Sequence, residues 1–595
     1  MTDSDPRGRR TSVRLAFRRL APLPLALLVS VTQTSVLRAQ SDDSGGTYHD
    51  DASLSESLRD LQRRHEDLVQ LLELARTPGG RAVQAVRLGS GPGAEDRPAL
   101  LVVAGAYGPH LIGTEVALHT ARQLAVRYGS DTTVTRLLDR STIYLVPRLN
   151  PDAASGYFAQ PRRERVRNSS PYDDDRDSEV DEDGPEDLDG NGVITMMRVL
   201  DPAGDWLTDP EEPALMRKAD PSRGESGTYR LYTEGTDNDG DELWNEDPPG
   251  GTDINRNLPY EYQFFAEGAG LYPVSASESR GLAQFFLDHP NIAVVYVLGP
   301  QDNLVAAWKH ERPSGSVEVE EEEQRNRRPL SSILEEDEPY FEEVAGRFKE
   351  ITGLVAGPRS PASGGDVLSF GYYDMGRWSF GSRAWWIPVY EAENGHGADE
   401  AAPRGEDTSQ DEEDPLEDER REFRWLRDNV PGSFVEWTEI RHPDFPDRTV
   451  ETGGFAPFVR YNPPASQVDS VLIRHERFIM ALAGLLPAVS VRDVRVEALA
   501  GGAYRVRVRI ANEAYLPTQS ALGERARWPR RVRVEIATDG QQIAAGRAIQ
   551  LLGPLPGSGQ GVELEWVLVG EAGSRITIRA SSPVSGESTQ TVTLR

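Results

Sequence analysis

The chain has 595 residues and carries 65 Lys and Arg against 96 Asp and Glu, which gives a formal net charge of −31. This length suits about two to four domains. The acidic balance disfavours nucleic acid and anionic membranes as partners, because both would repel the chain. Cysteine is absent, which excludes disulfide scaffolds, thiol catalysis and Cys-based zinc sites. Any metal must therefore bind His, Asp, Glu or carbonyl oxygen.

Residues 1–39 have the pattern of an export signal. Six arginines between residues 7 and 19 precede an apolar run at 20–31, and Ala39 stands just before an acidic segment. The run is shorter than the roughly 20 residues of a membrane-spanning helix, and two prolines interrupt it. We expect a cleaved signal peptide, no membrane span after its removal, and a periplasmic, cell-surface or extracellular protein. An uncleaved membrane anchor is the alternative.

Apolar runs alternate with helical patterns through the first half of the chain. This alternation predicts an α/β fold with a mixed, mostly parallel sheet flanked by helices. A binding site in such a fold lies beyond the carboxyl ends of the strands. The expected helices are residues 54–75 and 114–128, the second capped by Thr114, and the expected strands are 99–105, 142–146 and 291–298.

The texture changes near residue 488 to a strict alternation of apolar and polar residues. Short alternating strands separated by Gly, Pro and Asn turns predict an all-β immunoglobulin-like sandwich at 488–595. The expected organisation is therefore a signal peptide at 1–39, an α/β domain at 40–487 and this sandwich. The expected strands are 504–510, 531–536, 562–566, 575–578 and 591–594.

Three acidic insertions interrupt the α/β pattern, at 171–250, 312–345 and 398–422. The last two lack apolar periodicity and are expected to be solvated loops or disordered. The first contains an internal duplication, in which Asp-x-Asp-x-Asp-x-x-x-Asp-Glu-Asp from residue 173 matches Asp-x-Asp-x-Asp-x-x-x-Asn-Glu-Asp from residue 237.

Carboxylates at alternate positions of a tight loop can converge on one hard cation, and this spacing predicts Ca²⁺. The alternative is a solvated acidic loop. A third, shorter copy at 187–192 lacks the final acidic ligand, because Arg198 stands at that position. The predicted calcium ligands are Asp173, Asp175, Asp177, Asp181, Asp183, Asp237, Asp239, Asp241, Asn245 and Asp247.

Two motifs resemble the zinc carboxypeptidases of the carboxypeptidase A-like family. Arg-Leu-Asn-Pro-Asp-Ala at 148–153 is similar to the family's Asn-Pro-Asp-Gly turn, and 251–260 is similar to its Asp-x-Asn-Arg-Asn segment. The resemblance extends over about residues 54–486 and implies a carboxypeptidase-like fold. It also implies that Asn255 and Arg256 hold the C-terminal carboxylate of a peptide, which a guanidinium can bind in bidentate fashion. An internal ion pair with the acidic insertion is the alternative for Arg256.

The family binds zinc through His-x-x-Glu just after a strand and through a distant His after a later strand. Glu115 falls at the glutamate, but Ile112 stands at the first histidine and His110 lies two residues earlier. Gly-Pro-Gln-Asp at 299–302 stands where the second histidine is expected. Since zinc needs three protein ligands, Glu115 and His110 bind it only if a substitute completes the site. The candidate substitutes are His119, Asp302 and His310.

The general base of the family is also replaced. The frame at 376–385 matches the family's late strand and puts Arg383 at the glutamate, while a looser register offers Glu391 or Glu393. An arginine cannot accept a proton at working pH. The loop at 360–365 lacks the family's substrate-capping Tyr, and the oxyanion-stabilising Arg could be Arg163, Arg165 or another arginine of that cluster.

Three functions follow from these patterns. The first is an exported protein that binds the C-terminal carboxylate of peptides, or another carboxylate-bearing ligand, without hydrolysis. The second is an active zinc metallocarboxypeptidase with a rearranged metal site. The third is a calcium-stabilised, non-enzymatic surface-binding module.

Overall fold

The computed structural model describes residues 48–174, 178–245, 247–311, 330–361, 364–390, 416–527 and 529–595. The predicted signal peptide lies outside these ranges, as do four of the candidate site residues, Asp175, Asp177, Glu391 and Glu393. None of the helices in these ranges has the length and apolar character needed to cross a membrane.

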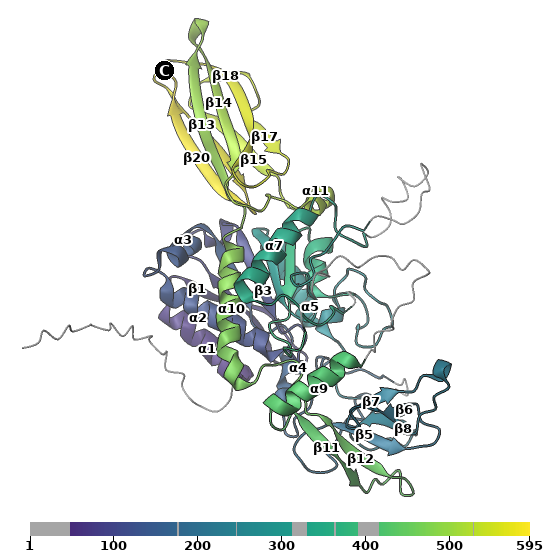
Figure 1. Ribbon diagram of the computed structural model, residues 1–595. Helices are drawn as coiled ribbons and strands as arrows, with labels where there is room; N and C mark the ends of the chain where they lie inside the picture. Colours follow the sequence, from purple (N-terminus) through teal and green to yellow (C-terminus); the bar gives the residue numbers. More distant parts are fainter. Residues whose placement is uncertain are drawn as a thin grey trace, which may run out of the picture. The chain divides into compact units, whose positions relative to one another are not determined.

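A six-stranded sheet with the order β1-β2-β4-β3-β9-β10 forms the centre of the α/β domain (Figure 1). Strands β4, β3, β9 and β10 run parallel, and β1 and β2 join at one edge in antiparallel pairing. The predicted mixed, mostly parallel sheet is therefore confirmed. The strands are β1 (Val69–Arg76), β2 (Ala82–Leu88), β3 (Ala99–Ala104), β4 (Thr142–Val146), β9 (Ile292–Leu298) and β10 (Trp378–Ser382).

Helices cover both faces of this sheet. Alternate residues of β3 enter two different cores: Leu100 and Val102 pack on one side, and Leu101 and Val103 on the other. All of β3 is buried, which explains its continuous apolar sequence. The helices are α1 (Asp51–Arg64), α2 (Leu111–Arg127), α3 (Thr132–Arg140), α4 (Pro151–Ala154), α5 (Ser277–Asp288), α7 (Glu338–Thr352), α8 (Val367–Ser369), α9 (Glu417–Asn429) and α10 (Ala465–Ala483).

Two expected helices have different bounds in the structure. The helix predicted at 54–75 ends at Arg64, and the residues after it form strand β1, which pairs with β2. The leucines of this stretch therefore belong partly to helix α1 and partly to strand β1, and pairing with β2 makes the second part a strand. Helix α2 begins at Leu111 after His110, so Thr114 is a buried residue inside the helix rather than its cap.

The acidic insertions also contain regular structure that the sequence patterns did not indicate. The end of the 312–345 insertion belongs to α7, whose Phe341 and Val344 are fully buried, so this part is not a solvated loop. The end of the 398–422 insertion begins α9. An apolar face on a short helix stabilises both segments despite their charge.

The 171–250 insertion contributes to a second, antiparallel sheet that the sequence did not predict. Its order is β11-β12-β5-β8-β6-β7 (Figure 1), so strands from the insertion pair with a hairpin more than 200 residues later. The strands are β5 (Met196–Leu200), β6 (Trp206–Thr208), β7 (Met216–Lys218), β8 (Tyr229–Thr233), β11 (Phe434–Ile440) and β12 (Val450–Phe455).

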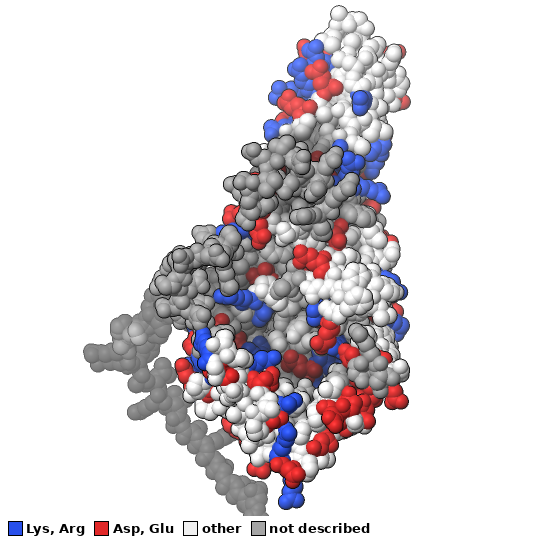
Figure 2. All heavy atoms as spheres, turned by 90° about the vertical axis from the view of Figure 1, so that its right-hand side faces the viewer, with Lys and Arg blue, Asp and Glu red and all other residues white. Residues whose placement is uncertain are grey.

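The C-terminal region is all-β, as predicted. Two four-stranded sheets, β13-β14-β18-β16 and β17-β15-β19-β20, enclose one core that contains Val506, Trp566 and Ile578. On the face of the molecule seen in Figure 2, acidic and basic side chains both occur among the described residues. The strands are β13 (Val489–Ala498), β14 (Ala503–Asn512), β15 (Val532–Thr538), β16 (Gln542–Ala545), β17 (Ile549–Leu552), β18 (Gln560–Val569), β19 (Arg575–Ser582) and β20 (Gly586–Thr593), with the short helix α11 (Ala521–Ala526) between β14 and β15.

Candidate functional site

A cleft of about 460 Å³ opens beyond the carboxyl ends of the parallel strands. Tyr107 and His110 follow β3, Gln301 follows β9 and Arg383 follows β10. This is the edge where the α/β pattern predicts a binding site. The cleft is lined by Tyr107, His110, Asp253, Asn255, Arg256, Gln263, Pro300, Gln301, Pro361, Gly364, Arg383 and Tyr461.

The two residues predicted to bind a carboxylate both line this cleft. They belong to a single turn of 3-10 helix, Ile254–Arg256, which Asp253 caps by accepting a hydrogen bond from the backbone N–H of Asn255 at 2.9 Å. The Asn255 amide donates to Gln301 Oε1 at 2.8 Å. One Nη of Arg256 donates to the backbone carbonyl of Glu267 at 3.0 Å. These contacts hold both side chains at the wall of the cleft.

Arg383 enters the same cleft from the end of β10, and its Nε donates to the carbonyl of Pro300 at 3.4 Å. Within the described ranges, neither Arg383 nor Arg256 forms a salt bridge, so the ion pair considered for Arg256 is not seen there. Two guanidinium groups therefore face one cleft without a salt bridge in these parts of the chain, and the nearest carboxyl of the lining, Asp253, interacts with Arg256 only electrostatically. Such a pair favours an anionic ligand.

His110 is buried in the cleft wall among aromatic rings. Its ring centroid lies 5.1 Å from that of Tyr107, at an interplanar angle of 77°, and 5.3 Å from that of Tyr461. Burial, and then the nearby charge of Arg383, lower the pKa of His110 to about 3. The imidazole is therefore neutral at physiological pH.

Asp253 places an acid with an unusual pKa in the cleft. Burial raises the pKa of this carboxyl to about 7, against the opposing effects of the Asn255 N–H and the Arg256 and Arg167 charges. The charge of the cleft therefore changes near neutral pH.

The other sequence-predicted zinc donors lie elsewhere, since only His110 among them lines the cleft. Glu115 accepts hydrogen bonds from the backbone N–H of His49 at 2.9 Å and from its Nδ1 at 2.8 Å. His119 Nε2 contacts Glu476 at 3.2 Å. The remaining substitutes are also held locally, since Asp302 Oδ1 accepts backbone N–H groups from residues 304–306 and His310 Nδ1 lies 2.8 Å from the carbonyl of Ile333.

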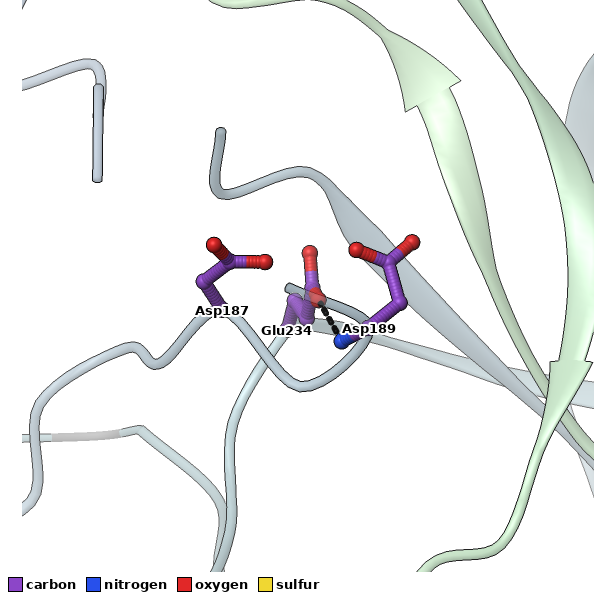
Figure 3. Close-up of side chains that lie close together, drawn as sticks. All are labelled: Asp187, Asp189 and Glu234. Atoms are coloured by element: carbon purple, nitrogen blue, oxygen red, sulfur yellow. Dashed lines mark hydrogen bonds between the residues drawn. The ribbon is translucent and has the colours of Figure 1, made fainter. Parts of the chain in front are cut away.

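The cleft does not offer the donor set that a zinc ion needs, which is three protein ligands with a water in the fourth position. Two groups of three acidic or histidine side chains in the described ranges lie close enough to share an ion. They are Asp187 with Asp189 and Glu234 (Figure 3), and Asp237 with Asp239 and Asp241. Neither group lines the cleft.

The residues that follow β3 show a spacing that the match to the family's zinc motif did not use. Tyr107 and His110 are three residues apart directly after β3, which is the spacing of the family's His-x-x-Glu, and both line the cleft. Gln301, three residues after the end of β9, also lines the cleft. Counting from the strand end, rather than from the nearest glutamate, would have found these residues.

The Asn-Pro-Asp motif supports the site without lining it. Asp152 is fully buried and accepts hydrogen bonds from Thr77 Oγ1, Arg81 Nη1 and the backbone N–H of Gly79 and Ser169. Arg163 and Arg165, the candidates for an oxyanion-stabilising arginine, do not line the cleft, and burial lowers the pKa of Arg165 to about 10.

Comparison with known proteins agrees with the resemblance seen in the sequence. The profile of the zinc carboxypeptidase family matches residues 54–183, which confirms a zinc carboxypeptidase-type segment there. Residues 488–593 match a domain of unknown function, DUF8731.

Individual relatives match over the same part of the chain. Human carboxypeptidase D is 34% identical over 107 residues, which is 18% of this chain and 8% of that protein. The inactive metallocarboxypeptidase ecm14 of Talaromyces marneffei is 31% identical over 121 residues, 19% of this chain and 20% of that protein. The chain thus spans less than a tenth of carboxypeptidase D. The solved structure of thrombin activatable fibrinolysis inhibitor aligns with 73% of each chain at 11% identity and a TM-score of 0.37.

Proposed function

We propose that this chain, whose residues 54–183 match the zinc carboxypeptidase family, is an exported protein that binds the C-terminal carboxylate of peptides in the cleft without zinc-dependent hydrolysis. One observation carries the proposal. Arg256 and Arg383 line the same cleft without a salt-bridge partner in the described ranges. A carboxylate is a ligand that two such guanidinium groups and the Asn255 amide can hold by charge-assisted hydrogen bonds.

The absence of hydrolysis rests on the chemistry of the side chains at the three strand ends. Among Tyr107, His110 and Gln301, only the neutral imidazole of His110 is a usual zinc ligand, so these side chains do not form the three-ligand set that a catalytic zinc site uses. Arg383 stands at the position that the family resemblance gives to the general base, and a guanidinium cannot take a proton from water. The described lining of the cleft thus has groups that bind an anion, and Asp253 is its one carboxyl.

The proposal is tested by measuring the affinity of a short peptide with a free C-terminus and of the same peptide as its C-terminal amide. We expect the free acid to bind at least about tenfold more tightly, because the amide loses the charge-assisted contacts. Arg256→Ala and Arg383→Ala should each reduce the affinity for the acid by roughly 10- to 100-fold. Arg280→Ala is the matched control, because Arg280 bonds only to nearby backbone carbonyls in the described structure and does not line the cleft.

Equal affinity for acid and amide would contradict the proposal, as would an unchanged affinity in both arginine variants. The same peptides, incubated with the zinc-dialysed protein and analysed by mass spectrometry, test the enzymatic alternative. Release of the C-terminal residue in proportion to bound zinc would establish an active carboxypeptidase instead.

A further inference from the structure

The loop that precedes helix α5 exposes several large apolar side chains. It comprises residues 257–276, and within it the side chains of Phe264 and Phe265 are 63% and 94% exposed. Leu271 and Tyr272 of the same loop are exposed as well. A lone exposed apolar side chain is ordinary in a protein, whereas four large ones in one loop indicate a surface that another molecule covers.

Three aromatic side chains of this loop form a cluster at the rim of the cleft. The ring centroids of Tyr262 and Phe264 lie 4.9 Å apart, edge to face, and those of Phe264 and Phe265 lie 6.4 Å apart. Gln263, between the first two in the sequence, lines the cleft, and its Nε2 lies beside Gly364, which also lines the cleft. The aromatic cluster of Tyr262, Phe264 and Phe265 is therefore continuous with the cleft wall.

Hydrogen bonds attach this loop to the wall of the cleft. Arg256 Nη1 donates to the carbonyl of Glu267 at 3.0 Å, and the backbone N–H of Asp253 donates to the carbonyl of Gly268 at 2.8 Å. The Tyr262 hydroxyl donates to another carbonyl of the same loop at 2.6 Å. The aromatic cluster is thus held in place before a ligand arrives, which reduces the entropy that binding costs.

Phe265 combines exposure with an unfavourable backbone conformation. Its φ is 65°, a left-handed value that is an outlier for a bulky residue. Strain of this kind persists only where the surrounding structure imposes it, and it is concentrated at functional sites. Because the ring is almost fully in water, it contributes little buried area to the folded state. Stability of the fold therefore does not explain a phenylalanine at this position.

We propose that the aromatic cluster binds an apolar side chain of the peptide, upstream of the C-terminal residue whose carboxylate lies in the cleft. This inference rests on the function proposed for the cleft and adds the class of peptide that the cleft prefers. A peptide held by Arg256 lies against the loop that supports this guanidinium, so its preceding residues leave the cleft past Gln263. Aromatic rings pair favourably with one another, so the expected ligand has an aromatic residue a few positions before its free C-terminus.

Two other molecules can cover exposed aromatic rings, namely a lipid surface and a second copy of this chain. The net charge of −31 opposes both the approach of an anionic lipid surface and the close approach of a second copy. A peptide that also reaches the guanidinium groups of the cleft meets positive charge instead. The position of the aromatic cluster at the cleft rim therefore favours the peptide.

The test measures the affinity of the full chain for free-acid peptides of serine and glycine in which one phenylalanine is moved stepwise away from the C-terminal residue. At one position the phenylalanine should raise the affinity at least about tenfold over serine, because it buries apolar area against the cluster. The double variant Phe264→Ser, Phe265→Asn should reduce this gain to less than about twofold, and asparagine is chosen because it tolerates the left-handed backbone. Leu551→Ser, an exposed apolar residue of strand β17, is the matched control and should keep the gain.

The C-terminal amides of the same peptides separate this inference from the proposed function. If the free acids bind more tightly than the amides but phenylalanine gives no gain at any position, the function of the cleft stands and this inference fails. Equal binding of acids and amides would overturn the proposed function itself. A gain that survives in the double variant would overturn the inference, as would self-association of the wild type, measured by sedimentation, that the double variant loses. If the double variant does not fold, Phe265→Asn alone takes its place and should lower the gain at least about threefold.

Discussion

The cleft and the duplicated acidic segments, 173–183 and 237–247, satisfy their charged groups in opposite ways. In the cleft, two guanidinium groups face a cavity, and its histidine is buried in neutral form. In the acidic segments, a buried carboxylate of Asp247 has an oxygen with no donor in the described ranges. The cleft therefore presents positive groups, whereas the acidic segments that carry Asp183 and Asp247 bury negative ones.

This difference indicates that metal binding depends on which side chains stand at the ends of the strands, and not on the fold alone. The α/β sheet and its cleft are present in this chain, whereas Tyr107, His110 and Gln301 stand at the ends of the strands.

Restoring zinc donors at the strand ends should convert the cleft into a metal site. The triple variant Tyr107→His, His110→Glu and Gln301→His supplies two imidazoles and one carboxylate. We expect it to bind zinc at least about 100-fold more tightly than the wild type, as measured by competition with a chromophoric chelator. Glu115→Gln should leave zinc binding unchanged, because His49 occupies that carboxylate. A folded triple variant without zinc affinity would show that the cleft geometry, and not only its residues, has diverged.

Asp209 is a buried carboxylate that already has a cationic partner, and removal of that partner should destabilise the protein. Arg420 and Asp209 form a salt bridge at 2.6 Å, with side-chain exposures of 4% and 0%. Arg420→Ala should lower the free energy of unfolding by about 3–5 kcal/mol, because it leaves a buried charge unpaired. Urea denaturation measures this change. The exposed Arg424, paired with Glu212, is the control, and its alanine variant should lose less than about 1 kcal/mol. Equal losses of unfolding free energy in the two variants would show that burial does not make the Arg420–Asp209 pair more important than the exposed one.

Asp152 shows how the protein itself can satisfy a buried carboxylate. Burial raises its pKa, but hydrogen bonds from Thr77, Arg81 and backbone N–H groups outweigh this, so the pKa lies below 3.8. Its contribution to stability is therefore present above pH 3.8 and is lost as the pH falls through the lower folded pKa. Asp152→Ala should cost roughly 2–3 kcal/mol at neutral pH and less in acid. A pH-independent loss, measured by denaturation at several pH values, would contradict this assignment.

The affinity of the cleft for a carboxylate should depend on pH through Asp253. Its pKa of about 7 makes it mainly neutral at pH 6 and negative at pH 8, and the added charge repels an anionic ligand. We expect the affinity for a free-acid peptide to fall by roughly fivefold over this range, equivalent to about 1 kcal/mol. Asp253→Asn should abolish the change, which fluorescence titration at both pH values can measure. An equally steep profile in that variant would assign the titration to another group.

Much of the fold follows from local sequence patterns. The buried strands β3, β4 and β9 are continuous apolar runs, and the alternating residues after 488 form the two C-terminal sheets. The segment that carries Asn255 and Arg256 is a short turn capped by Asp253, so its conformation depends on neighbouring residues. Patterns of this kind are visible because each element must bury one face or both.

The pairing of distant segments could not be seen in the sequence. Residues 69–76 continue a leucine-rich helical pattern, yet they form a strand because β2 supplies hydrogen-bond partners. The second sheet depends on strands β5 and β12, which are separated by more than 200 residues. The hydrogen bond between His49 and Glu115 likewise joins residues that lie 66 positions apart in the sequence.

By itself, the sequence determined the α/β and all-β regions and the repeat of the acidic segments, because these depend on periodicity and local motifs, and it singled out Asn255 and Arg256, which line the cleft. The tertiary structure decided that Tyr107, His110, Gln301 and Arg383 meet in one cleft. It also decided that Asp183 and Asp247 each accept a backbone N–H from the other acidic segment. The reason is physical: burial and the supply of hydrogen-bond donors determine whether a charged side chain is already satisfied, and both arise only when distant parts of the chain come together.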